Sequence, residues 1–214
     1  MDLNRYNIGA GLNKIVYVKL LEILDIFDDK IRVLEFGSGM STYFFIDYKN
    51  TYNKDLEIVS FDDSNEWCCK STDKCLKLCL RKLIECNEQD YNYQIEKQIF
   101  NRKLFYNKLT PLTWRQRNNF YDIQENDIEG LFDIVIIDGP NGNGRNLAYN
   151  FIQEHIKQGT IIVLDDFDGR DNEFDYKFVE ILQSYFDVDI LYKHDSDLNA
   201  NYENGGKFII FKVK

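Results

Sequence analysis

The sequence has no apolar run that approaches the roughly 20 residues a helix needs to cross a bilayer. Its first residues also lack the basic stretch followed by an apolar stretch that marks a secretory signal peptide. We therefore expect a cytoplasmic protein without a membrane partner. No internal repeat and no linker composition is visible, so we expect residues 1–214 to form a single domain with a sizeable core.

Clustered basic residues are scarce as well. The formal net charge is −10, whereas a protein that binds a long nucleic acid usually carries a basic surface, because phosphate neutralisation supplies most of the affinity. We interpret the one thin basic cluster as solvated surface and expect no nucleic-acid partner. A small molecule, a sugar or a nucleotide-linked metabolite is the better candidate substrate. The basic cluster comprises Arg102, Lys103, Lys108, Arg115 and Arg117.

The chain has five cysteines but no CxxC, and neither of its two histidines lies near them in sequence. This pattern argues against a zinc site, and the odd number argues against a disulfide framework. Cys68, Cys75, Cys79 and Cys86 are 7, 4 and 7 residues apart, which places them in one narrow stripe of a helix. We therefore expect a helix over about residues 64–86 with these cysteines on its core face.

Apolar periodicity predicts helices and strands in alternation, which implies a largely parallel sheet with helices on both faces. The central strands read as almost continuous apolar runs, as buried parallel strands do. The last two strands are joined by a polar loop and no helix, so we expect that pair to be antiparallel. The predicted helices cover 11–28, 42–48, 64–86, 145–157 and 173–185, and the predicted strands cover 31–36, 56–61, 103–107, 132–137, 160–164, 187–193 and 207–213.

Four of these strands end in acidic residues or glycine. In an open doubly wound sheet, ligands bind outside the carboxyl ends of the strands. An acid is costly inside an apolar layer, so several acids at one edge of the sheet indicate a site. The four ends are Glu35-Phe36-Gly37, Asp62-Asp63, Asp138-Gly139 and Asp165-Asp166.

The turn after the first strand, Gly37-Ser38-Gly39, permits a tight bend and a close approach of backbone to ligand. Asp62 lies 23 residues beyond Gly39, close to the spacing at which an acid caps a ribose. A dinucleotide-binding enzyme would share these features. However, Thr42 stands where the third glycine of GxGxxG would be, and the acid Glu35 precedes the loop.

Taken in order, E-F-G-S-G-x-S-T, V-S-F-D, F-D-I-V-I-I-D-G-P and I-V-L-D-D resemble class I S-adenosylmethionine-dependent methyltransferases over about residues 30–213. The resemblance implies a methyltransferase domain of the α/β class. Its sheet would be Rossmann-like, seven-stranded and mostly parallel, with an antiparallel last strand and helices on both faces. It also implies S-adenosyl-L-methionine as the cofactor. The implied cofactor residues are Gly37, Ser38, Gly39, Ser41 and Thr42 around the methionine part, Glu35 at the amino end, Asp62 on the ribose hydroxyls, and Asp138.

Asp138, Asp165 and Asp166 resemble the magnesium site of catechol O-methyltransferase-like and antibiotic sugar O-methyltransferases. Carboxylate oxygens suit this hard cation, and a bound dication would lower the pKa of a coordinated acceptor hydroxyl. Alternatively, Asp165 or Asp166 caps a turn or merely lines the pocket. Both interpretations stay open.

One departure concerns Pro140, which stands where sugar O-methyltransferases of that type often carry a second acid. The Asp-Gly-Pro sequence followed by Gly144-Arg145 resembles the glucuronoxylan methyltransferase-like group instead. Both groups imply methylation of a hydroxyl on a carbohydrate or small metabolite. The residues considered for acid–base catalysis are Asp138, Asp166, Asp168 and His194.

Several other side chains have two interpretations each. Arg145 would bind an acceptor carboxylate or phosphate, or would lie on a helix surface. Trp67 and Phe61 would cover an adenine or pack in the core, and Phe120 and Tyr121 would form core or acceptor wall. We interpret His155 as structural.

Two other functions remain as alternatives. One is a catalytically silent relative of the fold that binds a nucleotide or a partner protein. The other is a nucleic-acid methyltransferase, which the acidic charge opposes. The sequence predicts no oligomeric state.

Overall fold

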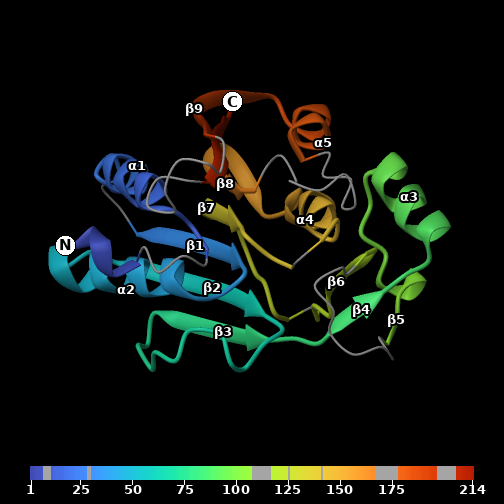
Figure 1. The fold of residues 1–214 in the computed structure, drawn as a ribbon, viewed down its shortest axis with the longest axis horizontal. Coiled ribbons are helices and arrows are strands. Elements are labelled where there is room, and N and C mark those ends of the chain that lie inside the picture. Colours follow the sequence, from blue (N-terminus) through green and yellow to red (C-terminus); the bar gives the residue numbers. More distant parts are fainter. Residues whose placement is uncertain are drawn as a thin grey trace.

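The computed structural model describes residues 1–6, 11–27, 30–107, 117–124, 126–140, 142–166, 178–196 and 206–214. Its main sheet has seven strands in the order β3-β2-β1-β7-β8-β10-β9 (Figure 1). Neighbouring strands from β3 to β8 are parallel, and β10 is antiparallel to both β8 and β9. The predicted α/β class, the seven strands and the antiparallel last strand are therefore confirmed. The strands are β1 (Ile31–Phe36), β2 (Leu56–Asp62), β3 (Leu76–Leu80), β7 (Phe132–Ile137), β8 (Ile156–Asp165), β9 (Val188–Ser196) and β10 (Gly206–Val213).

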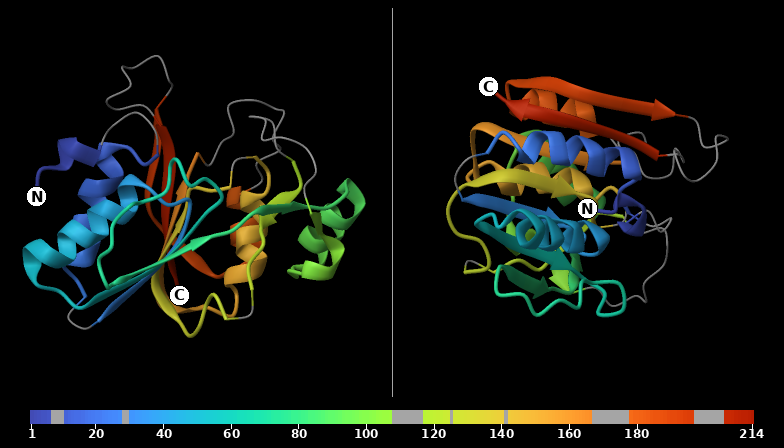
Figure 2. Two further views of the ribbon diagram at one scale, coloured as in Figure 1. Left: turned by 90° about the horizontal axis from the view of Figure 1, so that it is seen from below. Right: turned by 90° about the vertical axis from the view of Figure 1, so that its left-hand side faces the viewer.

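Helices cover both faces of this sheet (Figure 2, left). On one face lie α1 (Lys14–Leu24) and α2 (Met40–Tyr52). On the other lie α4 (Arg145–Ile152) and α5 (Phe178–Tyr185), with α3 (Glu88–Lys97) beyond α4. Two short 3₁₀ helices complete the list, η1 (Leu3–Tyr6) and η2 (Arg102–Leu104).

The two faces carry separate apolar cores, which explains the continuous apolar runs of the central strands. Ile134 and Ile136 of β7 pack in the core under α1 and α2, whereas Val135 and Ile137 pack in the core under α4 and α5. Successive side chains of a strand point to opposite faces, so a strand with two buried faces needs apolar residues at every position.

The predicted helix over residues 64–86 is wrong. The structure has a loop with turns up to Cys75, then β3, then the short strand β4 (Leu83–Glu85). The 7-4-7 cysteine spacing is coincidental, because Leu76-Lys77-Leu78-Cys79-Leu80 alternates with the period of two that a strand requires. Cys79 is buried beside Phe61 of β2, and the five cysteines are free.

The predicted strand over 103–107 is also placed differently. Only β5 (Tyr106–Asn107) forms there, and it belongs to a second, three-stranded sheet of order β5-β4-β6, with β6 spanning Asn119–Tyr121. In the main sheet the strand that follows β2 in sequence is β3, which forms the edge next to β2. This small sheet and α3 project beyond α4, on the right of Figure 1.

Some boundaries shift as well. Helix α4 ends at Ile152 and β8 begins at Ile156, so the predicted helix to residue 157 is too long. The predicted helix over 173–185 is observed from Phe178, and its earlier residues lie outside the described part of the chain. No helix in the described ranges is long and apolar enough to cross a membrane.

Candidate functional site

The glycine turn after β1 lies directly against the end of β7. Gly37 has a φ of +94°, and a Cβ placed on it would lie 3.0 Å from the Asp138 carbonyl carbon and 3.0 Å from the Gly139 nitrogen. The Asp138 N–H donates to the Phe36 carbonyl at 2.9 Å, which joins the two strand ends. Both the backbone conformation and the close approach therefore require glycine at position 37.

The residues that follow the turn begin α2, with Gly39 at the N-cap. The Gly39 N–H donates to Thr42 Oγ1 at 3.1 Å, and the Ser38 hydroxyl lies 3.1 Å from the same oxygen. The Cys69 N–H donates to Ser38 Oγ at 3.1 Å, so the loop after β2 is fastened to the turn. The predicted loop is thus held in one conformation by its own side chains.

Glu35, the acid before the turn, is fully buried. Its carboxylate accepts hydrogen bonds from the hydroxyls of Ser41, Thr42 (2.5 Å) and Ser60 (2.6 Å). Burial raises the pKa of Glu35 to about 7, although these three hydrogen bonds favour the charged form. A positive charge near Glu35 would therefore lower its pKa and favour the charged carboxylate.

Asp62, at the end of β2, is also buried beside the turn. Its carboxylate accepts from the N–H groups of Ser38 at 3.0 Å and Ser64 at 2.7 Å. Burial raises the pKa of Asp62 to about 6. Asp62 thus lies next to the glycine turn, as the sequence predicts, and its carboxylate joins this turn to the loop after β2.

Asp138, Asp165 and Asp166 meet at the carboxyl ends of β7 and β8. One oxygen from each lies within 4.8 Å of the others. The side chains of Asp138 and Asp165 are hydrogen-bonded to each other. Burial is the main cause that raises the pKa of both; the charge of Asp166 raises both further, and the charge of Asp138 also raises that of Asp165. Asp166 has a φ of +51° and is the solvent-facing member, with 46% of its side chain exposed.

Arg145 joins this acidic cluster. The sequence predicted either that Arg145 lies on a helix surface or that it binds an acceptor. In the structure its side chain is buried, with only 4% exposed. The guanidinium lies 3.5 Å from Asp138 Oδ1 and 3.4 Å from Asp166 Oδ2. It therefore binds acids of the protein itself.

The two histidines lie away from this cluster. His194 is on β9 and pairs with Phe208 of β10, which pairs in turn with Asp165 of β8. A whole strand therefore separates His194 from Asp165, and the His194 ring stacks on Phe208 with centroids 5.4 Å apart. His155 follows α4 and lies 3.1 Å from the Gly130 carbonyl oxygen through Nδ1. Asp168, Lys108 and Arg115 lie outside the described residues.

Of the aromatic candidates, Phe61, Phe120 and Tyr121 are buried in the core under α4. Trp67 is 69% exposed on the loop after β2, and its carbonyl oxygen would lie 3.8 Å from a Cβ on Gly39. It thus stays beside the turn without packing in the core.

Tyr17 on α1 was not predicted from the sequence as part of the site. This side chain is fully buried, and its hydroxyl has no hydrogen-bond partner among the described residues. Burial, and then the charges of Asp138, Glu35 and Asp165, raise the pKa of Tyr17. A tyrosine within an apolar helical stripe was the available signal, as was Ser60 within the apolar run of β2.

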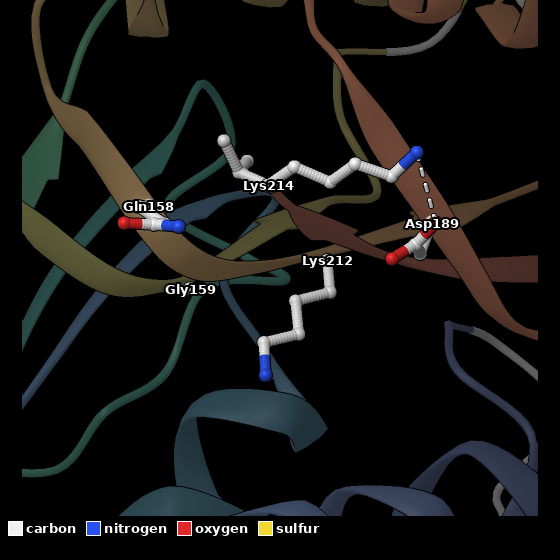
Figure 3. A pocket seen from close by; sticks show the side chains of 6 residues that line it. Gln158, Gly159, Asp189, Lys212 and Lys214 are labelled. Atoms are coloured by element: carbon white, nitrogen blue, oxygen red, sulfur yellow. Dashed lines mark ion pairs between the residues drawn. The ribbon is translucent and has the colours of Figure 1, made fainter.

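A hollow of about 520 Å³ lies at the opposite edge of the sheet, where β8 and β9 begin (Figure 3). Lys214 reaches Asp189 there at 3.1 Å, while Lys212 points away from both. None of the acids described above lines this hollow. Because ligands of such sheets bind at the carboxyl ends of the strands, the candidate site remains the glycine turn and the acidic cluster.

The fold is similar to that of solved S-adenosylmethionine-dependent methyltransferases. Similar solved structures include an rRNA methylase from Streptococcus thermophilus (TM-score 0.54, 10% identity, 95% of this chain and 99% of that one). Fibrillarin from Aeropyrum pernix, with bound S-adenosyl-L-methionine, has a TM-score of 0.52 at 10% identity over 96% and 76% of the two chains. Precorrin-6y C5,15-methyltransferase from Geobacter metallireducens has a TM-score of 0.50 at 14% identity over 94% and 88%.

No protein-family model and no curated protein sequence matches the chain. The similar structures range from a precorrin enzyme to an rRNA enzyme, so the shared property is the fold.

Proposed function

We propose that the protein is an S-adenosyl-L-methionine-dependent methyltransferase that methylates a hydroxyl of a carbohydrate or another small metabolite. The observation that carries the proposal is the group of buried acids around the glycine turn, together with the orphaned Tyr17 hydroxyl, whose pKa the charges of Asp138, Glu35 and Asp165 help to raise. A buried polar group without a partner is costly, so a ligand that supplies one would stabilise this arrangement.

The residues present fit the cofactor. Its methionyl ammonium and sulfonium are positive, and a positive charge beside Glu35 and Asp138 would favour the charged form of both acids. Gly37, Ser38 and Gly39 present backbone with little side chain in the way. Asp62 accepts backbone hydrogen bonds from Ser38, Ser64 and Asp63, and its two carboxylate oxygens retain acceptor capacity for a ribose hydroxyl.

The chemistry supplied by the bound cofactor is a methyl group on sulfur, open to attack by an acceptor oxygen. The protein's part is to hold the acceptor in line and to receive its proton. We propose that the aspartate cluster receives this proton. Asp166 is the proton acceptor, because it is the solvent-facing member of the cluster. His194 is too remote for this role, being one full strand away.

A small acceptor accords with the net charge of −10, which disfavours a polyanion. Support for a sugar comes from the resemblance of the Asp138-Gly139-Pro140 segment to sugar-methylating groups.

Magnesium at Asp138, Asp165 and Asp166 was predicted from the resemblance of these three residues to the metal site of catechol O-methyltransferase-like and antibiotic sugar O-methyltransferases. The three carboxylates are the right donor type for this ion. The buried Arg145 guanidinium, however, contacts two of the three, so a dication bound there would lie beside a fixed positive charge. The residues present therefore do not fit the ion as arranged, and no catalytic step is assigned to it.

The test is isothermal titration calorimetry of the purified chain with S-adenosyl-L-methionine and S-adenosylhomocysteine. We expect both to bind, and Tyr17→Phe to weaken binding by roughly tenfold, the value of one hydrogen bond to a charged group. Tyr48→Phe is the matched control: Tyr48 is also buried, but its hydroxyl contacts Asp25 at 3.4 Å, so affinity should not change. Absence of binding by folded protein would favour the catalytically silent alternative.

A further inference from the structure

Arg145 lies at the start of α4, and its side chain is buried at the carboxyl ends of β7 and β8. It is the first residue of α4, directly after Gly144, and this helix begins near the edge where β7 and β8 end (Figure 1). Its side chain extends into that edge and is almost completely buried. A buried arginine is uncommon unless paired, so its partners define its role.

In the described part of the chain the guanidinium contacts four oxygens at the ends of β7 and β8, two from each strand end. Nε donates to the Pro140 carbonyl and Nη1 to the Asp165 carbonyl, each at 3.2 Å. Nη2 lies 3.5 Å from Asp138 Oδ1, and Nη1 lies 3.4 Å from Asp166 Oδ2. This one cation therefore contacts the segments after both β7 and β8 and holds the two aspartates in position.

A set of carbonyl and carboxylate oxygens from two strand ends is what a hard dication would use. The guanidinium can neutralise and hold the same oxygens, because its planar fork directs N–H donors to several oxygens at once. Three aspartates without a cation would repel each other in a poorly solvated site. With Arg145 present, much of that repulsion is already offset.

We propose that Arg145 is the resident cation of the aspartate cluster and stands in for a divalent metal, so the protein positions Asp138 and Asp166 without one. Arg145 is thus a positioning residue. The inference predicts methyl transfer in the presence of a chelator, and this prediction rests on the proposed function. Its second prediction, that the native cluster binds no divalent metal, does not depend on that function.

The test measures Mn²⁺ binding to the full chain by electron paramagnetic resonance, with Mg²⁺ as the competitor. We expect no stoichiometric binding by the native protein. Arg145→Met removes the charge and keeps much of the length, and it should create a Mn²⁺ site that Asp165→Asn, added to it, abolishes. A merely structural arginine would not produce this gain of binding.

The control variant is Arg81→Met. Arg81 pairs with the largely buried Asp127, with Nε 2.7 Å from Oδ2, but among the described residues no group of three potential metal ligands forms there. This variant should lose stability without gaining a metal.

Two results would overturn the inference. One is a native protein that binds one Mn²⁺ and releases it on Asp165→Asn. The other is a folded Arg145→Met protein that binds none. If Arg145→Met unfolds in chelator, refolding with millimolar MgCl₂ is the measurement, and recovery supports the inference while failure counts against it. None of these readouts needs S-adenosyl-L-methionine, so failure of the proposed function is detected separately by calorimetry.

Discussion

Glu35 illustrates how one buried residue links stability to ligand binding. Its pKa is about 7 against an ordinary value of 4.5, and burial is the main cause. Since folding favours the protonated form, the contribution of Glu35 to stability is complete below pH 4.5. That contribution is lost as the pH rises through 7. Above pH 7 the charged carboxylate costs the protein ~3 kcal/mol at 1.36 kcal/mol per pKa unit.

We therefore expect Glu35→Gln to raise the free energy of unfolding at pH 8 by about 1–3 kcal/mol and to change it little at pH 5. Urea unfolding at the two pH values measures this. The same variant should bind the cofactor more weakly, because it lacks the negative charge.

Glu57→Gln is the control, and its expected effect on stability at pH 8 has the opposite sign to that of Glu35→Gln. Glu57 pairs with Lys30 and Arg32, and a hydrogen bond from Lys30 is the main cause of its lowered pKa. Its replacement should slightly lower stability at pH 8. If Glu35→Gln destabilised the protein at pH 8 as well, the buried charge would not be the cost that we infer.

At the scale of elements, the sequence predicted the central strands well and the segment between β2 and β7 badly. A strand buried on both faces is a short apolar run bounded by polar residues, and β1, β7 and the end of β8 stand out for that reason. In residues 64–86, cysteines and leucines fit a helical stripe as well as a strand. Pairing of β3 with β2, which is a long-range contact, decides between the two.

The site was predicted unevenly for a related reason. Residues at strand ends, such as Glu35, Asp62 and Asp165, are found from local pattern, because the topology brings all such ends to one edge. Arg145 and Tyr17 come from helices, and their burial depends on how each helix docks on the sheet. A single sequence contains no direct signal for that docking.

The docking of α4 gives a prediction of its own. A Cβ on Gly144 would lie 2.0 Å from the Asn119 carbonyl oxygen of β6, so no side chain fits between them. We expect Gly144→Ala to lower the free energy of unfolding by about 1–3 kcal/mol, the usual cost of overpacking. Thermal unfolding measures it.

The comparison for Gly144→Ala is Gly159→Ala. Gly159 has a φ of +88° but no atom within 4 Å of its Cβ position, so only backbone strain should appear, at about 1 kcal/mol. If Gly144→Ala cost no more than Gly159→Ala, helix α4 would not be held against β6 as closely as described.

At the scale of the molecule, the net charge bears on the class of the methyl acceptor. The net charge of −10 should repel a polyanion, and we expect no measurable binding of single-stranded RNA at low salt. Fluorescence anisotropy with a labelled oligonucleotide measures this. Micromolar binding that weakened steeply with added salt would reverse our choice of acceptor class.

The contact between Gly37 and Gly139 also has a use in finding relatives. A Cβ on Gly139 would lie 2.4 Å from the Tyr121 hydroxyl oxygen and 3.0 Å from the Gly37 Cα, and Gly37 has a positive φ, so a methyl group would be unfavourable at either position. Any relative that keeps this contact must carry both glycines, however far its remaining sequence has drifted. A search for Glu-x-Gly-Ser-Gly followed about 100 residues later by Asp-Gly would therefore collect distant relatives that overall identity fails to detect.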